Sequence, residues 1–265
     1  MIIEGARLKE YNDPADLLEF HRILSLPEEK LAEQERKIYF DSIEKYDYIN
    51  LLHNVFMQNI SLRYDWITTR SSAIKNFFLI ESSVGQPTII SNYQTFQEAE
   101  CAYFDRFQHN TNANIVLTQI QNVTFEQLST AYSNYVLSTH NFTSDCISRC
   151  VKEIRSAMIE RDVARYRRSA DLYLNVIAHQ MIRINHEIFT LNNMSTLKTN
   201  PKHKEWVKDL QHQIAQLKHR KEKIQDIYIE TNMHQANFVT RYRFENCAKD
   251  ISKKYDQLVK DHLPK

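Results

Sequence analysis

"LKTNPKHKEW", residues 197–206, decides how the chain is organised. It places Pro201, one of 5 prolines in the chain, among the basic side chains of Lys198, Lys202, His203 and Lys204. Proline lacks a backbone N–H and has a fixed φ, so it breaks a helix interior but is accepted in a turn or in the first turn of a helix. We therefore interpret this stretch as the basic tip of a helical hairpin.

The composition around this tip predicts an all-α fold. The chain has 265 residues but only 2 glycines, far below the usual share of roughly 7%. Residues 88–200 contain neither glycine nor proline. Tight hairpin turns and phosphate-binding loops need glycine because it adopts positive φ freely. The chain therefore cannot carry a Walker-type loop or a dinucleotide-binding fingerprint.

The breaks along the chain predict an acidic lead-in or linker over 1–27 and a single helical domain over 28–265. Within that domain we expect helices over 28–82, 91–197 and 202–262, the second with a kink near 122–124. If straight, the helices before and after Pro201 would each be about 80–90 Å long at 1.5 Å per residue. We expect an elongated antiparallel bundle of three long, kinked, coiled-coil-like helices.

Apolar residues recur at spacings of three and four on both sides of the tip, which indicates a packed seam. The seam residues are Val207, Leu210, Ile214, Leu217, Ile224 and Tyr228 after the tip, with Ile177 and Ile184 before it. After about residue 231 the seam slips phase and resumes at Phe244. A phase slip bends a helix relative to its partner. A lone hairpin would expose these seams, so we expect a curved dimer, formed by two identical chains or with a related chain.

The formal net charge of +1 conceals a gradient. Residues 1–50 carry 7 basic and 12 acidic side chains, whereas residues 198–265 carry 15 and 9. The basic clusters outside the tip are Arg161, Arg165, Arg167 and Arg168 in the first, and Lys218, Arg220, Lys221 and Lys223 in the second. With the tip they would line one edge of a hairpin and face an anionic partner. Ordinary solvated helix surface is the alternative interpretation, since most charge runs are that.

Other reactive side chains give weaker indications. Cys146 and Cys150 lie one helical turn apart, and with Cys101 and Cys247 they could form a tetrahedral zinc site. Reduced, buried cysteines are the favoured interpretation.

His179 and His186 share a helix face, which we interpret as a polar surface, because nothing supplies convergent ligands. We predict no metal, no cofactor, no nucleic-acid partner and no enzymatic activity. The beginning of the chain lacks the charged-then-apolar order of an export signal, and the uncharged run at 107–125 is too rich in Asn, Gln and Thr to span a bilayer. We therefore expect a cytoplasmic location.

Three stretches resemble the BAR domain of the sorting-nexin type. "SAMIERDVARYRRSADLYLNVI", 156–177, is similar to the second helix of that group, where an Arg-Asp pair precedes an aromatic residue, an alanine and a leucine. "TNPKHKEWVKDLQHQI", 199–214, resembles the basic tip loop that leads into the third helix. "ANFVTRYRFENCAKDISKKY", 236–255, resembles the pattern of phenylalanine and basic residues late in that helix. The resemblance covers roughly residues 28–262.

The resemblance implies a dimeric, non-enzymatic module that binds or senses curved, phosphoinositide-rich membranes in endosomal sorting and protein transport. The chain would then lie peripherally on endosomal membranes, although no phox-homology domain is visible in it. The alternative is a soluble helical adaptor or secretion-associated protein that docks an acidic protein partner. A helical enzyme with a surface-built site is a third possibility, which no catalytic constellation supports.

Overall fold

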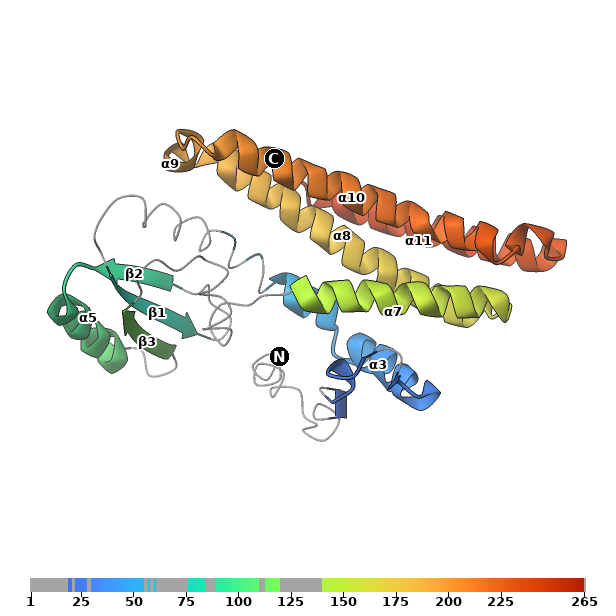
Figure 1. Cartoon of the computed structure of the whole chain (residues 1–265), viewed down its shortest axis with the longest axis horizontal. Helices are drawn as coiled ribbons and strands as arrows, with labels where there is room; N and C mark the ends of the chain where they lie inside the picture. The colour runs from blue at the N-terminus through green and yellow to red at the C-terminus, as the bar shows by residue number, and fades with distance from the viewer. Residues whose placement is uncertain are drawn as a thin grey trace. The chain divides into compact units, whose positions relative to one another are not determined.

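The computed structural model describes residues 19–20, 22–27, 30–54, 57, 60, 76–83, 89–109, 113–119 and 140–264 (Figure 1). The chain divides into two compact units, where the sequence analysis expected one helical domain. Unit 1 comprises Met1–Ser138 and Met194–Thr199, and unit 2 comprises Thr139–Asn193 and Asn200–Lys265. Each unit is described by itself.

In unit 1, helix α3 (Glu33–Lys45) contributes to an aromatic cluster. The backbone N–H of Ala32 donates to the Glu35 carboxylate at 2.9 Å, which satisfies one of the free donors at the start of the helix. Tyr39 and Phe20 are completely buried, with ring centroids 6.1 Å apart. Packing of this aromatic pair fixes the buried face of the helix.

Unit 1 also contains a small antiparallel sheet that the sequence analysis did not predict. Its strands are β1 (Phe77–Ser83), β2 (Ile89–Tyr93) and β3 (Ala113–Gln119), in the order β2-β1-β3. In the central strand, Leu79 is paired with Ser91 on one side and Leu117 on the other. The prediction of helix over 77–82, 91–93 and 113–119 is therefore wrong. Short apolar runs such as "FFLI" fit a buried strand as well as a helix, and only pairing with distant strands decides between them.

Helix α5 (Phe96–His109) packs on this sheet (Figure 1). Its Arg106 donates to the Glu81 carboxylate at 2.7 Å and to the Ser91 hydroxyl at 2.9 Å. One partly buried guanidinium thus ties the helix to two strands, and its charge is balanced by a carboxylate that is itself mostly buried.

Unit 2 is helical. Its elements are α7 (His140–Ile159), α8 (Val163–Asn193), α10 (His203–Glu230), the short 3₁₀ helix η2 (Met233–Gln235) and α11 (Phe238–Asp261). The four-residue helix α9 (Ser195–Lys198), between α8 and α10 in the chain, is grouped with unit 1.

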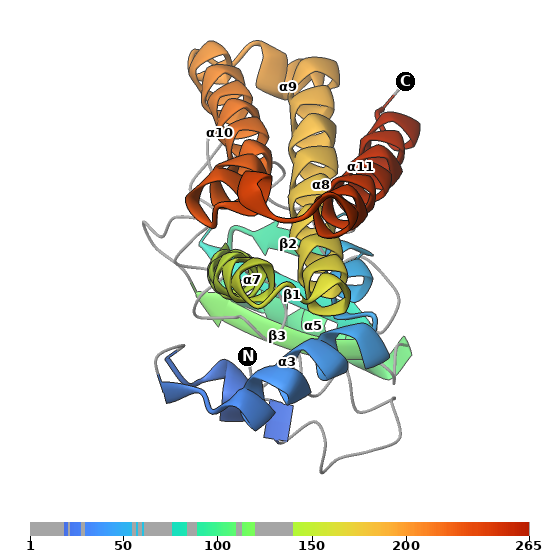
Figure 2. The same cartoon turned by 90° about the vertical axis from the view of Figure 1, so that its right-hand side faces the viewer.

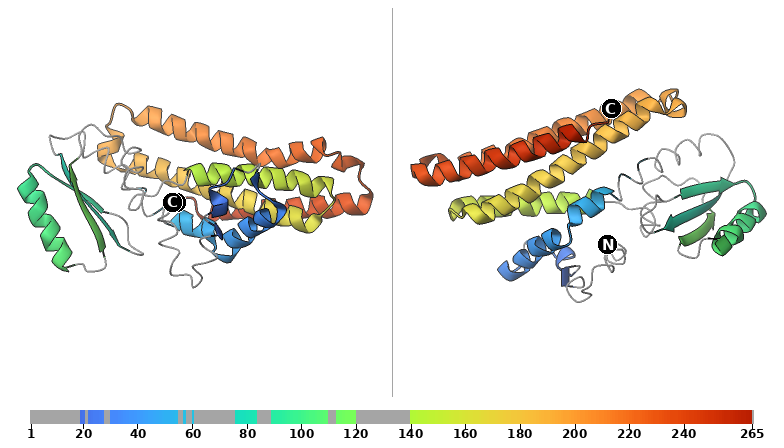
Figure 3. Two further views of the ribbon diagram at one scale, coloured as in Figure 1. Left: turned by 60° about the horizontal axis from the view of Figure 1, so that its bottom comes forward. Right: turned by 180° about the vertical axis from the view of Figure 1, so that it is seen from behind.

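Helix α8 lies at the centre of unit 2, with α7, α10 and α11 around it (Figures 2 and 3). Its predicted seam residues Ile177 and Ile184 are each 2% exposed. In the predicted seam of α10, Leu210 and Leu217 are buried, and Val207, Ile214, Ile224 and Tyr228 are half-buried. However, α8 buries residues on more than one stripe, including Val176, Ala178 and Ile182. This is the pattern of a central helix in a bundle, and the structure gives no support for a coiled coil.

The two longest predicted helices are broken by turns with left-handed residues. Arg161 has φ 61° between α7 and α8, and Asn232 has φ 52° between α10 and α11. A left-handed residue after the last helical turn is a common way to end a helix. The single helix expected over 202–262 is therefore wrong, because the chain reverses where we inferred a phase slip. Helices α8 and α10 are about 46 and 42 Å long, roughly half the expected length.

Parts of the remaining expectations lie outside the described residues. The kink predicted near 122–124 is one of these, as are 28–29, 55–56, 58–59 and 61–75 of the predicted first helix. The acidic lead-in over 1–27 is described only at 19–20 and 22–27. Over 30–54 helix dominates, as predicted, with a turn at Tyr46 and Asp47.

Phe244 provides a test of the packing of α11 on α8. It is completely buried, and its ring centroid lies 4.9 Å from that of Tyr166. We expect Phe244→Ala to destabilise the protein by about 3–5 kcal/mol, because a buried ring is lost and a cavity remains. Phe238→Ala, at a position 69% exposed on the same helix, should change stability by less than about 0.5 kcal/mol. Urea unfolding followed by far-UV circular dichroism measures both; equal effects would contradict this packing of α11.

Candidate functional site

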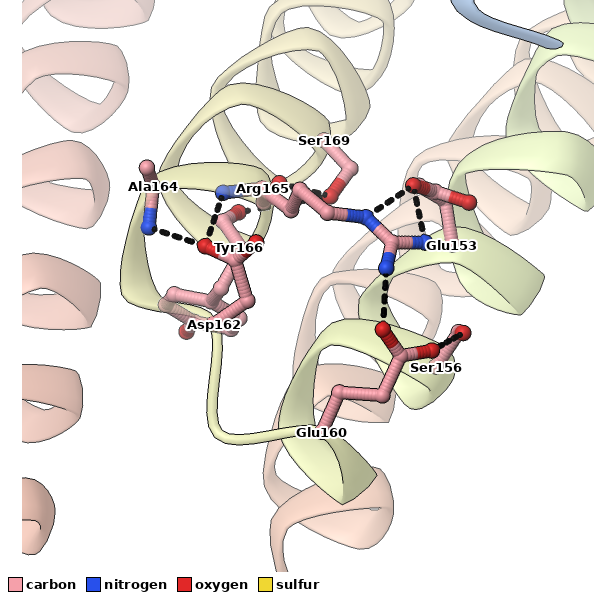
Figure 4. A network of polar contacts seen from close by, with 8 residues as sticks. All are labelled: Glu153, Ser156, Glu160, Asp162, Ala164, Arg165, Tyr166 and Ser169. Carbon is pink, nitrogen blue, oxygen red and sulfur yellow. Dashed lines mark hydrogen bonds and ion pairs between the residues drawn. The ribbon is translucent and has the colours of Figure 1, made fainter. Parts of the chain in front are cut away.

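The turn between α7 and α8 is built from the Arg-Asp pair that the sequence analysis singled out (Figure 4). Backbone N–H groups of Arg161 and Asp162 donate to the carbonyl oxygens of Met158 and Ala157, which is the Schellman pattern that closes a helix. The Asp162 carboxylate then accepts from the backbone N–H groups of Ala164 and Arg165, each at 3.0 Å, and so caps α8. This pair therefore ends one helix and begins the next.

The predicted arginine cluster is largely engaged within the protein. Arg165 donates to Glu153 at 2.9 Å and also binds Glu160, as Figure 4 shows. Arg161 lies in the turn between α7 and α8, outside the helix that carries Arg165. Its guanidinium donates to the Met158 carbonyl oxygen at 3.2 Å and contacts the sulfur of Met233. Arg167 lies 4.0 Å from the Asp250 carboxylate, and Arg168 is half-buried.

Two of the four cations in the second cluster are also paired. Lys221 binds the Asp256 carboxylate of α11. Lys223 lies 3.5 Å from Asp226 and 3.4 Å from Glu230. Exposed pairs of this kind each contribute between about 0 and 1 kcal/mol. The pair of Lys221 and Asp256 joins α10 to α11, whereas the pairs of Lys223 lie within α10, and all of them leave little charge for an external partner.

Other predicted cations keep their charge available. The side chains of Lys202, Lys204 and Lys218 are exposed and form no ion pair or hydrogen bond with any residue that the structure describes. The same holds for Lys198 at the end of α9 and for Lys208, which the sequence analysis did not select. Arg220 is exposed, and its backbone carbonyl accepts from the Tyr173 hydroxyl. His203 is half-buried, and its Nε2 has no hydrogen-bond partner among the described residues.

A second row of unpaired lysines lies on α11, and the sequence analysis missed it. Lys249, Lys253 and Lys260 are exposed, and none has a side-chain partner in the described part of the chain. They follow Tyr242 at spacings of seven, four and seven residues, which places all four side chains on one helix face. A single helix over 202–262 does not predict this row, because the turn between α10 and α11 changes which residues share a helix face.

The lysines of α10 and α11 lie on the outward-facing sides of these two helices. The hydroxyl of Tyr228 donates to Glu245 at 2.8 Å, and with the pair of Lys221 and Asp256 it links the two helices. Both helices pack on the central helix α8 (Figure 2), and Leu217 and Phe244 are among their buried residues. By helical spacing, Lys204 and Lys208 of α10 and the three lysines of α11 lie on the far side of each helix from those residues, whereas Lys218 lies at the flank of α10 next to Leu217. We call the outward-facing sides of these two helices together the outer face, defined by Lys204, Lys208, Lys218, Lys249, Lys253 and Lys260.

Carboxylates on the outer face are fewer than the lysines. Glu222 and Asp226 share the lysine side of α10, and Asp256, which is bound by Lys221, shares that of α11. Asp226 is paired with Lys223, and Glu222 lies 3.8 Å from His219, which is charged only when protonated. The outer face therefore keeps a net positive charge.

The histidines considered in the sequence analysis lie on a polar stripe of α8. A ring nitrogen of His186 lies 2.9 Å from the backbone oxygen of His262, and Arg183 lies 3.9 Å from Glu187, a residue only 2% exposed. Burial, together with the nearby His262, lowers the pKa of His179 to about 4. This stripe is a packed polar surface, as favoured from the sequence. Among the residues that the structure describes, no three His, Cys, Asp or Glu side chains are placed to hold a metal ion.

The cysteines are free thiols in the described ranges. Cys146, Cys150 and Cys247 are buried as expected, whereas Cys101 is exposed. Burial raises the pKa of the Cys150 thiol well above its usual value, and its neighbour Cys146 adds to this. A thiol that resists ionisation is a poor nucleophile.

Comparison with models of known families, with curated proteins and with solved structures finds no match to this chain. None of the described helices is long and apolar enough to cross a bilayer.

The buried histidine gives a testable pH dependence. Because the pKa of His179 is about 4 in the folded protein and near 6.5 when unfolded, the unfolded state binds more protons between these values. Stability should therefore fall as the pH drops from about 6.5 to 4, by on the order of 3 kcal/mol from this group alone. Urea unfolding across this pH range should show a shallower loss for His179→Gln than for the wild type. Parallel curves for the two proteins would show that His179 is not the group responsible.

Proposed function

We propose that the chain is a non-enzymatic docking module whose outer face binds the surface of an anionic membrane. The observation that carries this proposal is the presence, on the outward-facing sides of α10 and α11, of six exposed lysines without a side-chain partner among the described residues. Each lysine near an anionic bilayer contributes on the order of 1 kcal/mol, and salt screens this attraction. Several weak contacts then sum to useful binding.

Several arginines of unit 2 are paired with carboxylates, whereas many of its lysines are not, and this difference favours a membrane as the anionic partner. Arginines such as Arg155 and Arg165 are engaged with carboxylates inside the unit, which suits their planar, bidentate geometry. The available cations are lysines, which act as flexible point charges. Between Lys204 and Lys218 they are spread over about 21 Å of a single helix. Dispersed point charges match a diffuse anionic surface better than a compact acidic peptide.

The proposal keeps the function expected from the sequence but not its geometry. The resemblance to BAR domains implied three long helices, and helices α8 and α10 are much shorter than expected. Dimerisation, which would double the number of lysines that reach one membrane, remains part of the proposal. So does a peripheral place on endosomal membranes, which rests on the resemblance alone.

The test compares two double variants with the same change in charge. Lys249→Glu with Lys253→Glu alters the outer face, and Lys30→Glu with Lys37→Glu alters exposed lysines of unit 1. We expect wild type and the unit 1 variant to co-sediment with phosphatidylserine-containing vesicles at low salt, and more weakly at physiological salt. The outer-face variant should bind about tenfold more weakly, because two attractive charges become repulsive.

Three outcomes would overturn the proposal. Equal sedimentation of the two variants would show that the outer face is not the contact. Equal binding of wild type to neutral and anionic vesicles would show that charge is not the cause. No wild-type binding at low salt, with binding to an acidic protein surface instead, would favour the alternative function as an adaptor.

A further inference from the structure

One end of unit 2 exposes large apolar side chains that a soluble helical bundle would ordinarily bury. At the turn between α10 and α11, Ile229 is 58% exposed, Phe238 69%, Val239 62% and Tyr242 55%. We call these four residues the turn cluster. Isolated exposed apolar residues are common, but here they fall within fourteen residues of sequence on either side of one turn.

The turn cluster is held in a defined conformation. The side chain of Asn237 accepts from the backbone N–H of Thr240 at 2.9 Å and so caps α11 immediately before Phe238. The rings of Phe238 and Tyr242 are stacked, with centroids 5.9 Å apart and planes at 21°. The Arg241 guanidinium lies 6.0 Å from the Phe238 centroid. The exposed rings are thus already ordered on a helix, so burying them elsewhere costs little conformational entropy.

Charge around the turn cluster is positive, because the neighbouring carboxylates are already neutralised. Glu245 accepts from the Tyr228 hydroxyl at 2.8 Å and lies 3.7 Å from Arg241. Glu230 is bound by Arg155 at 2.6 Å, and Lys223 lies 3.4 Å away. The exposed side chain of Arg243, in contrast, has no partner among the described residues.

The turn cluster continues the outer face. Tyr242 lies seven residues before Lys249, on the same face of α11. Ile229 lies eleven residues after Lys218, which likewise returns it to the lysine side of α10. A surface that meets the lysines of α11 therefore also meets Tyr242 at one end of that helix.

From this juxtaposition we propose that the turn cluster is a membrane-inserting element, with Phe238, Val239, Tyr242 and Ile229 entering the boundary between lipid headgroups and acyl chains. Exposed aromatic and aliphatic side chains next to basic ones are the pattern of helices that lie in this boundary. The inference rests on the proposed function, to which it adds an apolar contact that salt does not screen. The lysines bring the protein to the surface, and the turn cluster holds one end of unit 2 in it.

A second copy of the chain is a poorer occupant of this surface. In a symmetric dimer the same patch meets itself, so Arg243 and Lys249 would approach their counterparts. The nearby carboxylates of Glu230 and Glu245 are already engaged and cannot balance that charge. Anionic lipid headgroups supply the missing negative charge, while the acyl chains accept the rings.

The experiment places a tryptophan in the turn cluster and asks whether it enters the bilayer. Phe238→Trp and a control, Gln34→Trp on exposed α3, are mixed with phosphatidylserine-containing vesicles at low salt. After subtraction of the wild-type signal, we expect the emission of the tryptophan at position 238 to shift to the blue and to be quenched by bromine atoms on the acyl chains. The tryptophan at position 34 should show neither effect.

A second pair of variants separates insertion from electrostatic attraction. Phe238→Ser with Tyr242→Ser should lower vesicle binding about tenfold at physiological salt, where attraction by the lysines is screened. Phe104→Ser with Phe107→Ser, which removes two exposed aromatic rings from α5, should bind like wild type. Thermal melts of the two tryptophan variants and the two double serine variants test whether each protein is folded.

The outcomes distinguish this inference from the proposed function. Vesicle binding without quenching at position 238 would overturn insertion and leave the docking of the lysines intact. Absence of any vesicle binding would overturn both. A dimer mass in light scattering that Phe238→Ser with Tyr242→Ser reduces to the monomer would show that a second copy occupies the turn cluster, and would also overturn insertion.

Discussion

Burial of α8 on several sides is the constraint on which the rest of unit 2 depends. Helices α7, α10 and α11 each pack against it, and its 31 residues include large side chains such as Tyr166 and Tyr173 that are almost fully buried. Because one helix provides the shared core, the outer helices need only one apolar stripe each. Their remaining surface is then available for charge, and the two rows of lysines can exist without a cost to folding.

The charged side chains divide into two groups by their neighbours. Arg155, Arg165 and Lys221 join different helices through carboxylates, so they belong to the packing of the unit. The lysines of the outer face are exposed and have no side-chain partner among the described residues. Counting basic residues along the chain merges these groups, whereas the distinction between a paired and an unpaired cation decides what a surface can bind.

Much of the helical content follows from the sequence, because the α8 and α10 seams repeat over many turns. Residues such as Leu210, Leu217, Ile177 and Ile184 are buried, as their spacing predicted.

The positions of the chain reversals could not be predicted from the sequence. These depend on Arg161 and Asn232 in left-handed conformations, which composition signals poorly because glycine is the usual residue there. The sheet was not predicted because no local sequence pattern indicates that β1 pairs with the distant strand β3. Of the candidate site, Lys204 and Lys218 were predicted but Lys208 was not, and the α11 row depended on a helix boundary that was placed wrongly.

The two reversals at one end of unit 2 also bear on how the chain folds. Helices α7 and α8 form one local hairpin, and α10 and α11 form another, each closed by a turn of a few residues. The side chain of Arg161 reaches Met233, 72 residues along the chain, and Thr231 lies 3.7 Å from the sulfur of Met158. Contacts within each hairpin have low sequence separation and form early, whereas the contact between the turns must await closure of a long loop. We therefore expect the two hairpins of unit 2 to form first and their docking to be the slower step in folding.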